Sequence, residues 1–154
     1  MKTKFEIIST LQAKYIRCVD RDELEKWPDY FTEDCFYKVT TADNVKNKLP
    51  AGLIYAKSKN MLKDRVSALR EANIYEAHTY RHIIGSPIIE EKAEGVFAET
   101  PFFVLRIMHD GKTEIFASGV YEDIYKFDGE QALIKERIVI CDSDQIDTLL
   151  AIPI

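Results

Sequence analysis

The stretch EIFASGVYEDIYKFDGEQALIKERIVIC, residues 114–141, decides the fold. Its two arms are rich in aromatic and β-branched residues and alternate with a period of two, which is typical of β-strands. Asp128-Gly129 joins the arms, and Asp-Gly between two such runs is a strong signal for a β-hairpin. The run TPFFVLRIMH, residues 100–109, precedes them across a second such pair, Asp110-Gly111. The second half of the chain is therefore predicted to form successive antiparallel strands.

The first residues of the chain carry the period of a helix instead. Thr3 and Glu6 have the spacing of a capping box, which predicts a helix start. Apolar residues then recur at i, i+3, i+7, i+10 and i+11, namely Ile8, Leu11, Tyr15, Cys18 and Val19. This spacing places them on one stripe of a helix that faces a core.

A second capping-box pair, Asp22 and Glu25, predicts a short helix after the first. Trp27-Pro28 is expected to end it, because the residue before a proline avoids the helical region. The following residues become aromatic and β-branched, so residues 35–41 are predicted to form the first strand.

Residues 42–57 contain Asn, Lys, Pro and Gly and are predicted to form a loop. Ser58 is placed to cap a third helix, whose apolar residues at i, i+4 and i+7 are Leu62, Val66 and Leu69. Helices followed by hairpins predict an α+β fold with an antiparallel sheet. Because no linker or internal repeat interrupts the chain, we expect residues 1–154 to form one domain.

The late strands are apolar on both faces. In residues 100–109, one face carries Phe103, Leu105 and Ile107, and the other carries Phe102, Val104 and Met108. A sheet with helices on one side and solvent on the other alternates more cleanly. Either the sheet curls so that the domain covers both faces, or another subunit covers the second face. The pattern leaves both interpretations open.

Composition excludes several classes of partner. The 154 residues include 21 basic and 26 acidic ones, interspersed, for a net charge of −5, so nucleic acid and anionic membranes are poor partners. No apolar run approaches the ~20 residues of a membrane span, and MKTKFEIISTLQ lacks the features of a signal peptide. Cys18, Cys35 and Cys141 are scattered without a CxxC pair, which argues against disulfides and metal clusters. We therefore expect a cytoplasmic protein with reduced thiols.

The best candidates for chemistry lie in and near YRHIIGSP, residues 80–87. His78 and His82 are four residues apart, as two metal ligands on a helix are, but no acidic ligand pattern accompanies them. A pocket between helices and a concave sheet would draw on Tyr15, Trp27, Tyr37, Tyr80 and His82. Acid–base chemistry often takes place in such pockets, but aromatic residues at these spacings also simply fill a core, and we favour that interpretation. The chain has no GxSxG, GxGxxG or P-loop motif.

Three segments resemble one known family in order and spacing. The segment WPDYFTEDCFYKV carries Trp27, Tyr30-Phe31, Glu33-Asp34, Tyr37 and Val39; a helix with Arg-Val leads to Arg81-His82; and the last hairpin carries Gly119, Asp123, Arg137, Val139 and Asp142. Across roughly residues 5–154 the chain resembles the small (beta) subunit of aromatic-ring-hydroxylating dioxygenases, the Rieske non-heme iron oxygenases.

The resemblance implies a cone-like fold of the ketosteroid-isomerase and cystatin-like kind, a curved antiparallel sheet with N-terminal helices on its concave face. It also implies a large alpha subunit as partner, typically in an α3β3 assembly. In such enzymes the alpha subunit holds the Rieske [2Fe–2S] cluster and the mononuclear iron, and electrons come from an NAD(P)H reductase, often through a ferredoxin. A Rieske centre needs two Cys and two His, and oxygen activation needs two His and a carboxylate. Three histidines in this chain cannot supply both.

We therefore expect a non-catalytic structural subunit that stabilises an oxygenase acting on a small aromatic compound, with aromatic acids among the candidates. Arg81 and His82 are candidates for the subunit interface, and no residue of this chain is expected to be catalytic or to bind a cofactor or metal. The alternative is a stand-alone isomerase or dehydratase that uses the cone pocket. In that alternative His82 is the acid–base group and Tyr80 or Tyr15 is the hydrogen-bond donor.

Overall fold

The computed structural model describes residues 1–50, 52, 54–72, 78–143 and 153–154. The helices are α1 (Lys4–Asp20), the 3-10 helix η1 (Leu24–Tyr30), α2 (Ala42–Lys46) and α3 (Lys59–Ala72). The strands are β1 (Phe31–Thr41), β2 (Ile54–Ala56), β3 (His78–Ile84), β4 (Ile88–Lys92), β5 (Gly95–Met108), β6 (Thr113–Asp128) and β7 (Gln131–Cys141). Among the described residues, no helix is long and apolar enough to cross a membrane.

The strands form one sheet in the order β2-β1-β7-β6-β5-β3, and β4 pairs with β5 beside this path. Gly111 and Gly129 have positive φ angles in the two predicted hairpin turns, where glycine is favoured. All pairs are antiparallel except β1–β7, which is parallel with Val39 opposite Val139. The prediction of a wholly antiparallel sheet was therefore wrong for this pair. Hairpin signals predict pairing only between strands that follow each other along the chain, whereas β1 and β7 pair although they lie near opposite ends of the sequence.

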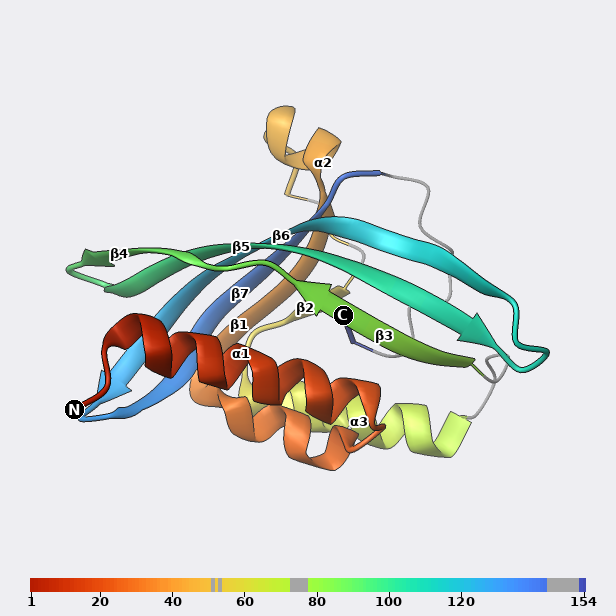
Figure 1. Ribbon diagram of the computed structural model, residues 1–154, viewed down its shortest axis with the longest axis horizontal. Coiled ribbons are helices and arrows are strands. Elements are labelled where there is room, and N and C mark those ends of the chain that lie inside the picture. The colour runs from red at the N-terminus through yellow and green to blue at the C-terminus, as the bar shows by residue number, and fades with distance from the viewer. Residues whose placement is uncertain (51, 53, 73–77, 144–152) are drawn as a thin grey trace.

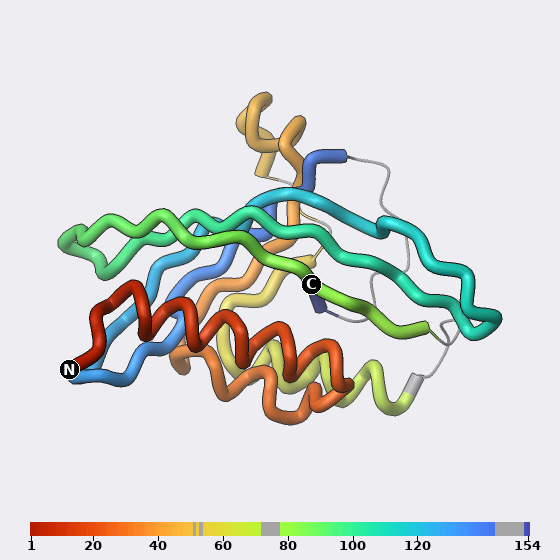
Figure 2. The backbone as a smooth tube through the Cα atoms, in the orientation of Figure 1, coloured from red at the N-terminus to blue at the C-terminus, as the bar shows by residue number. Residues whose placement is uncertain are grey.

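The helices α1, η1 and α3 lie together on one side of the sheet, which arches over them (Figures 1 and 2). Helix α1 turns its predicted stripe toward the sheet and buries Ile8, Tyr15, Cys18 and Val19, while Leu11 is partly buried. These side chains form one core with the concave face of the strands. The predicted cone-like α+β fold, with helices on the concave face, is confirmed.

Two of the predicted helix starts are formed. The Thr3 side chain accepts a hydrogen bond from the Glu6 amide at 3.1 Å, and the Glu6 carboxylate accepts one from the Thr3 amide at 2.7 Å. Ser58 precedes α3, and its hydroxyl accepts a hydrogen bond from the Met61 amide at 3.2 Å. Both caps satisfy amides that a helix leaves without partners in its first turn.

The predicted capping box of Asp22 and Glu25 is not formed. Glu23 is the residue before η1, and its side chain makes no capping hydrogen bond. The carboxylates of Asp22 and Glu25 instead both accept hydrogen bonds from Arg70 of α3, at 2.9 and 2.6 Å. Because one guanidinium has five donors in a planar fork, it binds both acids and ties η1 to α3.

Three predicted boundaries also differ from the structure. The helix continues past Pro28 to Tyr30, because it is a 3-10 helix rather than an α-helix. Strand β1 begins at Phe31 rather than at residue 35. The predicted loop 42–57 contains the short helix α2, capped by Thr41, and the three-residue strand β2. Strand β2 is stabilised by pairing with β1, a contact that a local sequence pattern does not report.

The backbones of β6 and β7 approach closely at Gly119. A Cβ added there would lie 1.9 Å from the carbonyl oxygen of Ile140. Real Cβ atoms do not come this near to a backbone oxygen, so only glycine fits without moving the neighbouring strand.

Gly119→Ala is accordingly expected to lower the free energy of unfolding by about 1–3 kcal/mol, because β7 must shift away from β6. Urea unfolding measures this loss. Gly129→Asn is the control, since Gly129 has open space and a φ of +61° that Asn tolerates. Equal stability of the two variants would contradict the close approach.

Candidate functional site and partner surface

A buried ion pair joins β6 and β7 on the concave face of the sheet. Asp123 and Arg137 lie opposite each other in the register. Arg137 donates through Nε to Oδ1 and through Nη2 to Oδ2 of Asp123, both at 2.8 Å. Both side chains are fully buried. A bidentate pair of this kind is the arrangement that best offsets the cost of removing two charges from water.

Polar neighbours complete this pair and connect it to α1. Tyr125 donates to Asp123 at 2.9 Å, and Arg137 donates to the Tyr125 hydroxyl at 3.2 Å. The side-chain amide of Gln12 donates to Tyr125 at 3.1 Å and to Thr100 of β5 at 2.9 Å. One hydrogen-bonded network therefore holds α1 against three strands of the sheet.

Aromatic rings enclose the guanidinium of Arg137. Its Cζ atom lies 4.4 Å from the ring centre of Tyr15 and 4.1 Å from that of Tyr121. Burial is the largest single effect and opposes the charge, but the Asp123 carboxylate, its hydrogen bond and the neighbouring tyrosines together outweigh it and keep the pKa of Arg137 well above its ordinary value. Burial also raises the pKa of Tyr15 and, more strongly, that of Tyr121. These phenols therefore stay neutral at physiological pH and line the cation with π faces.

The predicted pocket residues fall into two groups. Tyr15 accepts a hydrogen bond from the Trp27 indole at 2.8 Å, and Trp27 stacks edge to face on Tyr37 at 5.3 Å. Tyr80 and His82 lie on β3, with their ring centres 6.1 Å apart. All five side chains are buried, in agreement with the favoured interpretation that they fill the core.

His82 forms a buried contact with the last residue of α1. Its Nδ1 lies 2.6 Å from Oδ1 of Asp20, and its backbone amide donates to Oδ2 of Asp20 at 2.9 Å. Both side chains are almost completely buried. The sequence analysis did not identify Asp20, because its partner lies 62 residues away in the chain. This contact holds the end of α1 on β3.

The two histidines of the predicted HxxxH pair do not form a metal site in the described part of the chain. Tyr80 lies between them, with its ring centre 4.9 Å from that of His78. Within the described ranges, no group of three or more His, Cys, Asp or Glu side chains is arranged to hold a metal ion.

Arg81 points to the other side of β3. Its side chain is 65% exposed, although one guanidinium nitrogen lies 4.0 Å from Asp20. It stands opposite Leu105 in the register of β3 and β5. Of the two predicted interface residues, Arg81 is therefore at the surface and His82 is inside.

The face of the sheet turned away from α1, η1 and α3 carries an apolar surface, here called the outer patch: Ile83, Phe103, Leu105 and Ile115. Ile83 pairs with Phe103, and Leu105 with Ile115. Strand β6 has one residue, Phe116, more than β5 between two paired positions. Because of this bulge, Phe116 stacks on Tyr80 on the inner side of the sheet, while its neighbour Ile115 is 70% exposed on the outer side. Apolar side chains gathered on a sheet face that none of the described helices covers are typical of a binding surface.

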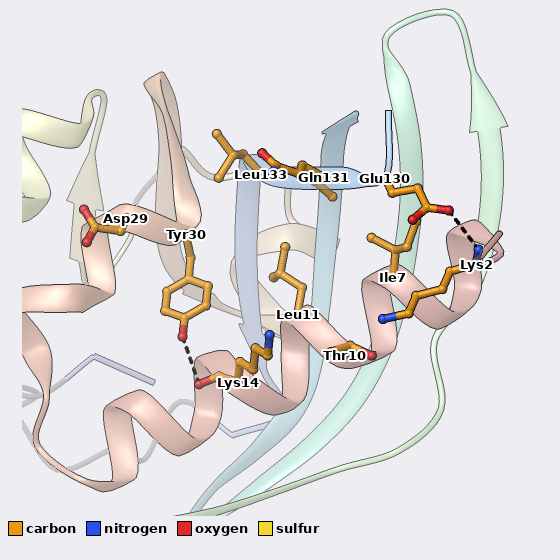
Figure 3. A pocket seen from close by; sticks show the side chains of 11 residues that line it. Lys2, Ile7, Thr10, Leu11, Lys14, Asp29, Tyr30, Glu130, Gln131 and Leu133 are labelled. Atoms are coloured by element: carbon orange, nitrogen blue, oxygen red, sulfur yellow. Dashed lines mark hydrogen bonds between the residues drawn. The ribbon is translucent and has the colours of Figure 1, made fainter. Parts of the chain in front are cut away.

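A surface groove of about 350 Å³ lies between α1, η1 and the turn from β6 to β7. Figure 3 shows Ile7 and Leu11 in it, with Lys2, Lys14, Asp29 and Glu130 around them. Tyr30 closes one side by donating to the backbone carbonyl of Lys14 at 3.2 Å. The groove carries charges of both signs and is separate from the buried network.

Comparison with known proteins identifies the family. The model of the ring hydroxylating beta subunit family matches residues 15–148. The chain is 51% identical over 148 residues to a terephthalate 1,2-dioxygenase terminal oxygenase beta subunit of Comamonas sp, covering 96% of both chains. It is 39% identical to the anthranilate 1,2-dioxygenase small subunit of Burkholderia cepacia, over all of this chain and 96% of the other.

The fold agrees with a solved structure. The crystal structure of a beta subunit provisionally assigned to an aromatic-ring-hydroxylating dioxygenase of Novosphingobium aromaticivorans superposes with a TM-score of 0.89 at 41% identity, covering 97% of this chain and 96% of the other. The chain belongs to the family of ring-hydroxylating beta subunits and is the small subunit of a multicomponent aromatic oxygenase. Family membership favours the oxygenase subunit over the alternative of a stand-alone isomerase or dehydratase.

Arg137→Leu is expected to destabilise the chain by about 3–5 kcal/mol, because Asp123 would stay buried without its cation. Urea unfolding of the isolated chain is the measurement. Lys135→Ala, on the same strand, is the control: its ion pair with Asp34 is partly exposed on the lysine side and largely exposed on the aspartate side, so its removal should change little. If both variants lose the same stability, the buried pair does not have the role assigned to it.

Asp20→Ala is expected to cost about 1.5–3 kcal/mol, because it leaves both the His82 amide and the His82 ring without their acceptor. Glu25→Ala removes an exposed carboxylate from the Arg70 contact and should cost much less. Thermal unfolding of the two variants compares them directly. A Glu25 variant less stable than the Asp20 variant would contradict this assignment.

Proposed function

We propose that this chain is a non-catalytic structural subunit that stabilises the oligomer of its oxygenase by burying the outer patch against the catalytic alpha subunit. The outer patch is the observation that carries the proposal, because the helices of this chain cover the opposite face of the sheet. Of the two interpretations that the sequence left open, we adopt the one in which another subunit covers this face.

Arg81 is the polar part of the proposed interface. It stands opposite Leu105 at the edge of the outer patch, and its exposed guanidinium is suited to bind a carboxylate of the partner with two hydrogen bonds. His82 serves the interface indirectly, because its contact with Asp20 fixes β3 and hence the position of Arg81.

Membership of the family supports the following proposals for the partner subunit and its chemistry. We place the Rieske [2Fe–2S] cluster and the mononuclear iron in the alpha subunit, in an α3β3 assembly that receives electrons from an NAD(P)H reductase with or without a ferredoxin. The relatives are named for terephthalate and anthranilate, which are both aromatic carboxylates, so we propose an aromatic acid as substrate. We also propose that residues 1–154 act as one domain, in the cytoplasm, where Cys18, Cys35 and Cys141 stay reduced.

The test is coexpression of this chain with its large subunit. Phe103→Asp and Ile115→Asp are each expected to reduce copurification of the large subunit at least tenfold, because a carboxylate in a desolvated interface lacks a partner. Ile115 is 70% exposed, so the melting temperature of the isolated Ile115→Asp chain should change little; Phe103 is 38% exposed, so Phe103→Asp should lower it no more than Asp at an equally exposed apolar position.

Leu133→Asp is the matched control. Leu133 is 39% exposed, close to the 38% of Phe103, but it lines the groove of Figure 3 and is not part of the outer patch. Unchanged copurification of the Phe103 and Ile115 variants would contradict the proposed interface. Stoichiometric iron in the isolated chain, or turnover of an aromatic acid by it, would contradict the non-catalytic role.

A further inference from the structure

The groove between α1, η1 and the turn from β6 to β7 has an apolar floor and a fixed wall. Leu11 and Ala132 line the floor and are partly buried, because they pack against the core. The ring of Tyr30 forms the wall. It is held by an edge-to-face contact with Tyr15, at 5.7 Å between ring centres, and by its hydrogen bond to the Lys14 carbonyl. Burial raises the pKa of Tyr30, so this wall is uncharged at physiological pH.

Two ammonium groups lie along the α1 side of this groove. Figure 3 shows the side chains of Lys2 and Lys14 there, with Thr10 between them. Among the described residues, no ion pair includes the side chain of either lysine. Both cations are therefore available to an anionic ligand, and the Thr10 hydroxyl can donate a further hydrogen bond.

Two carboxylates limit what can bind between these cations. Asp29 lies beyond Tyr30 at one end of the groove. Glu130, which accepts a hydrogen bond of 3.1 Å from the Lys2 amide, lies at the other end. Because like charges repel, a ligand with an anionic group at each end would be repelled by these carboxylates. A ligand with one anionic group, placed between Lys2 and Lys14, avoids both.

We propose that this groove binds an aromatic monocarboxylate, with its ring on Leu11 and Ala132 and its carboxylate between the ammonium groups of the two lysines. The volume of about 350 Å³ is at the lower end of the roughly 300–1,000 Å³ of small-molecule sites, which combine apolar walls with a few polar groups. The Tyr30 ring favours an aromatic ligand, because two rings in contact gain more than the area that they bury. The groove is separate from the outer patch, so this inference does not depend on the interface proposed above.

The test titrates sodium benzoate into the full chain at constant ionic strength and follows the backbone amides by NMR. Saturable shifts are expected at Leu11 and Ala132, with a dissociation constant of about 0.1–1 mM, since the ligand is small and its ion pairs are exposed. Terephthalate, which has a second carboxylate, and hexanoate, which has no ring, should each bind at least about threefold more weakly. Equal affinity for either would overturn the proposed ligand class, and the absence of saturable shifts would overturn the site.

Two lysine substitutions test the cations. Lys2→Gln and Lys14→Gln are each expected to weaken benzoate binding roughly twofold to fivefold, the worth of one exposed ion pair. Lys46→Gln is the control, because it removes the same charge from α2, outside the groove. If the control weakens binding as much as the other two variants, the chain attracts anions through its overall charge, and the groove is not their site.

Leu133→Asp separates a small-molecule site from a protein-binding surface. Its carboxylate would line the groove and is expected to weaken benzoate binding roughly tenfold or more, through repulsion and lost apolar contact. Copurification of the large subunit should stay unchanged. If Leu133→Asp loses the large subunit as strongly as Phe103→Asp does, a segment of that subunit occupies the groove and the ligand proposal is wrong. A loss confined to benzoate binding, or to the large subunit in Phe103→Asp, tests each proposal separately.

Discussion

The buried ion pair of Asp123 and Arg137 is the constraint on which the rest of the structure depends. Two charges have been moved from water to the inner face of a sheet, where burial is costly unless the charges are paired and hydrogen-bonded. Tyr125 and Gln12 supply hydrogen bonds, and Tyr15 and Tyr121 supply ring faces. Since Gln12 and Tyr15 are both on α1, the pair also determines where that helix lies.

The position of α1 has consequences at its other end. Its last residue, Asp20, reaches β3 and binds His82 through both the ring and the backbone amide. The alternation of the strand then turns Arg81 outward, beside the outer patch. The ion pair and the contact of Asp20 with His82 thus lie inside the chain, on the concave side of the sheet, whereas the opposite face exposes apolar side chains. This division suits a subunit whose own interior supports folding and whose outer surface supports assembly.

Much of this architecture is predictable from the sequence. Three of the sequence signals involve only a few neighbouring residues: the Asp-Gly turns, the period of the late strands and the capping box at Thr3. The structure contains the turns, the strands and the capping box that they predict. The parallel pairing of β1 with β7 and the contact of Asp20 with His82 join distant segments, so no local pattern reports them. Arg137 and Asp123 could be recognised as motif positions, but a charged residue in a strand usually faces solvent. The register of β6 and β7 pairs them, and the complete burial of both side chains shows that they point inward.

The central claim is that the side chains of this subunit hold structure and do no chemistry. The most direct measurement is turnover of an aromatic acid, per alpha-subunit iron, in purified complexes that carry Tyr15→Phe, Tyr80→Phe or His82→Gln in this chain. These are the side chains that the sequence analysis named as candidates for acid–base chemistry in the cone. The account predicts that every complex which assembles with full iron content turns over at the wild-type rate. A stable, fully assembled and iron-replete complex that is inactive would contradict it.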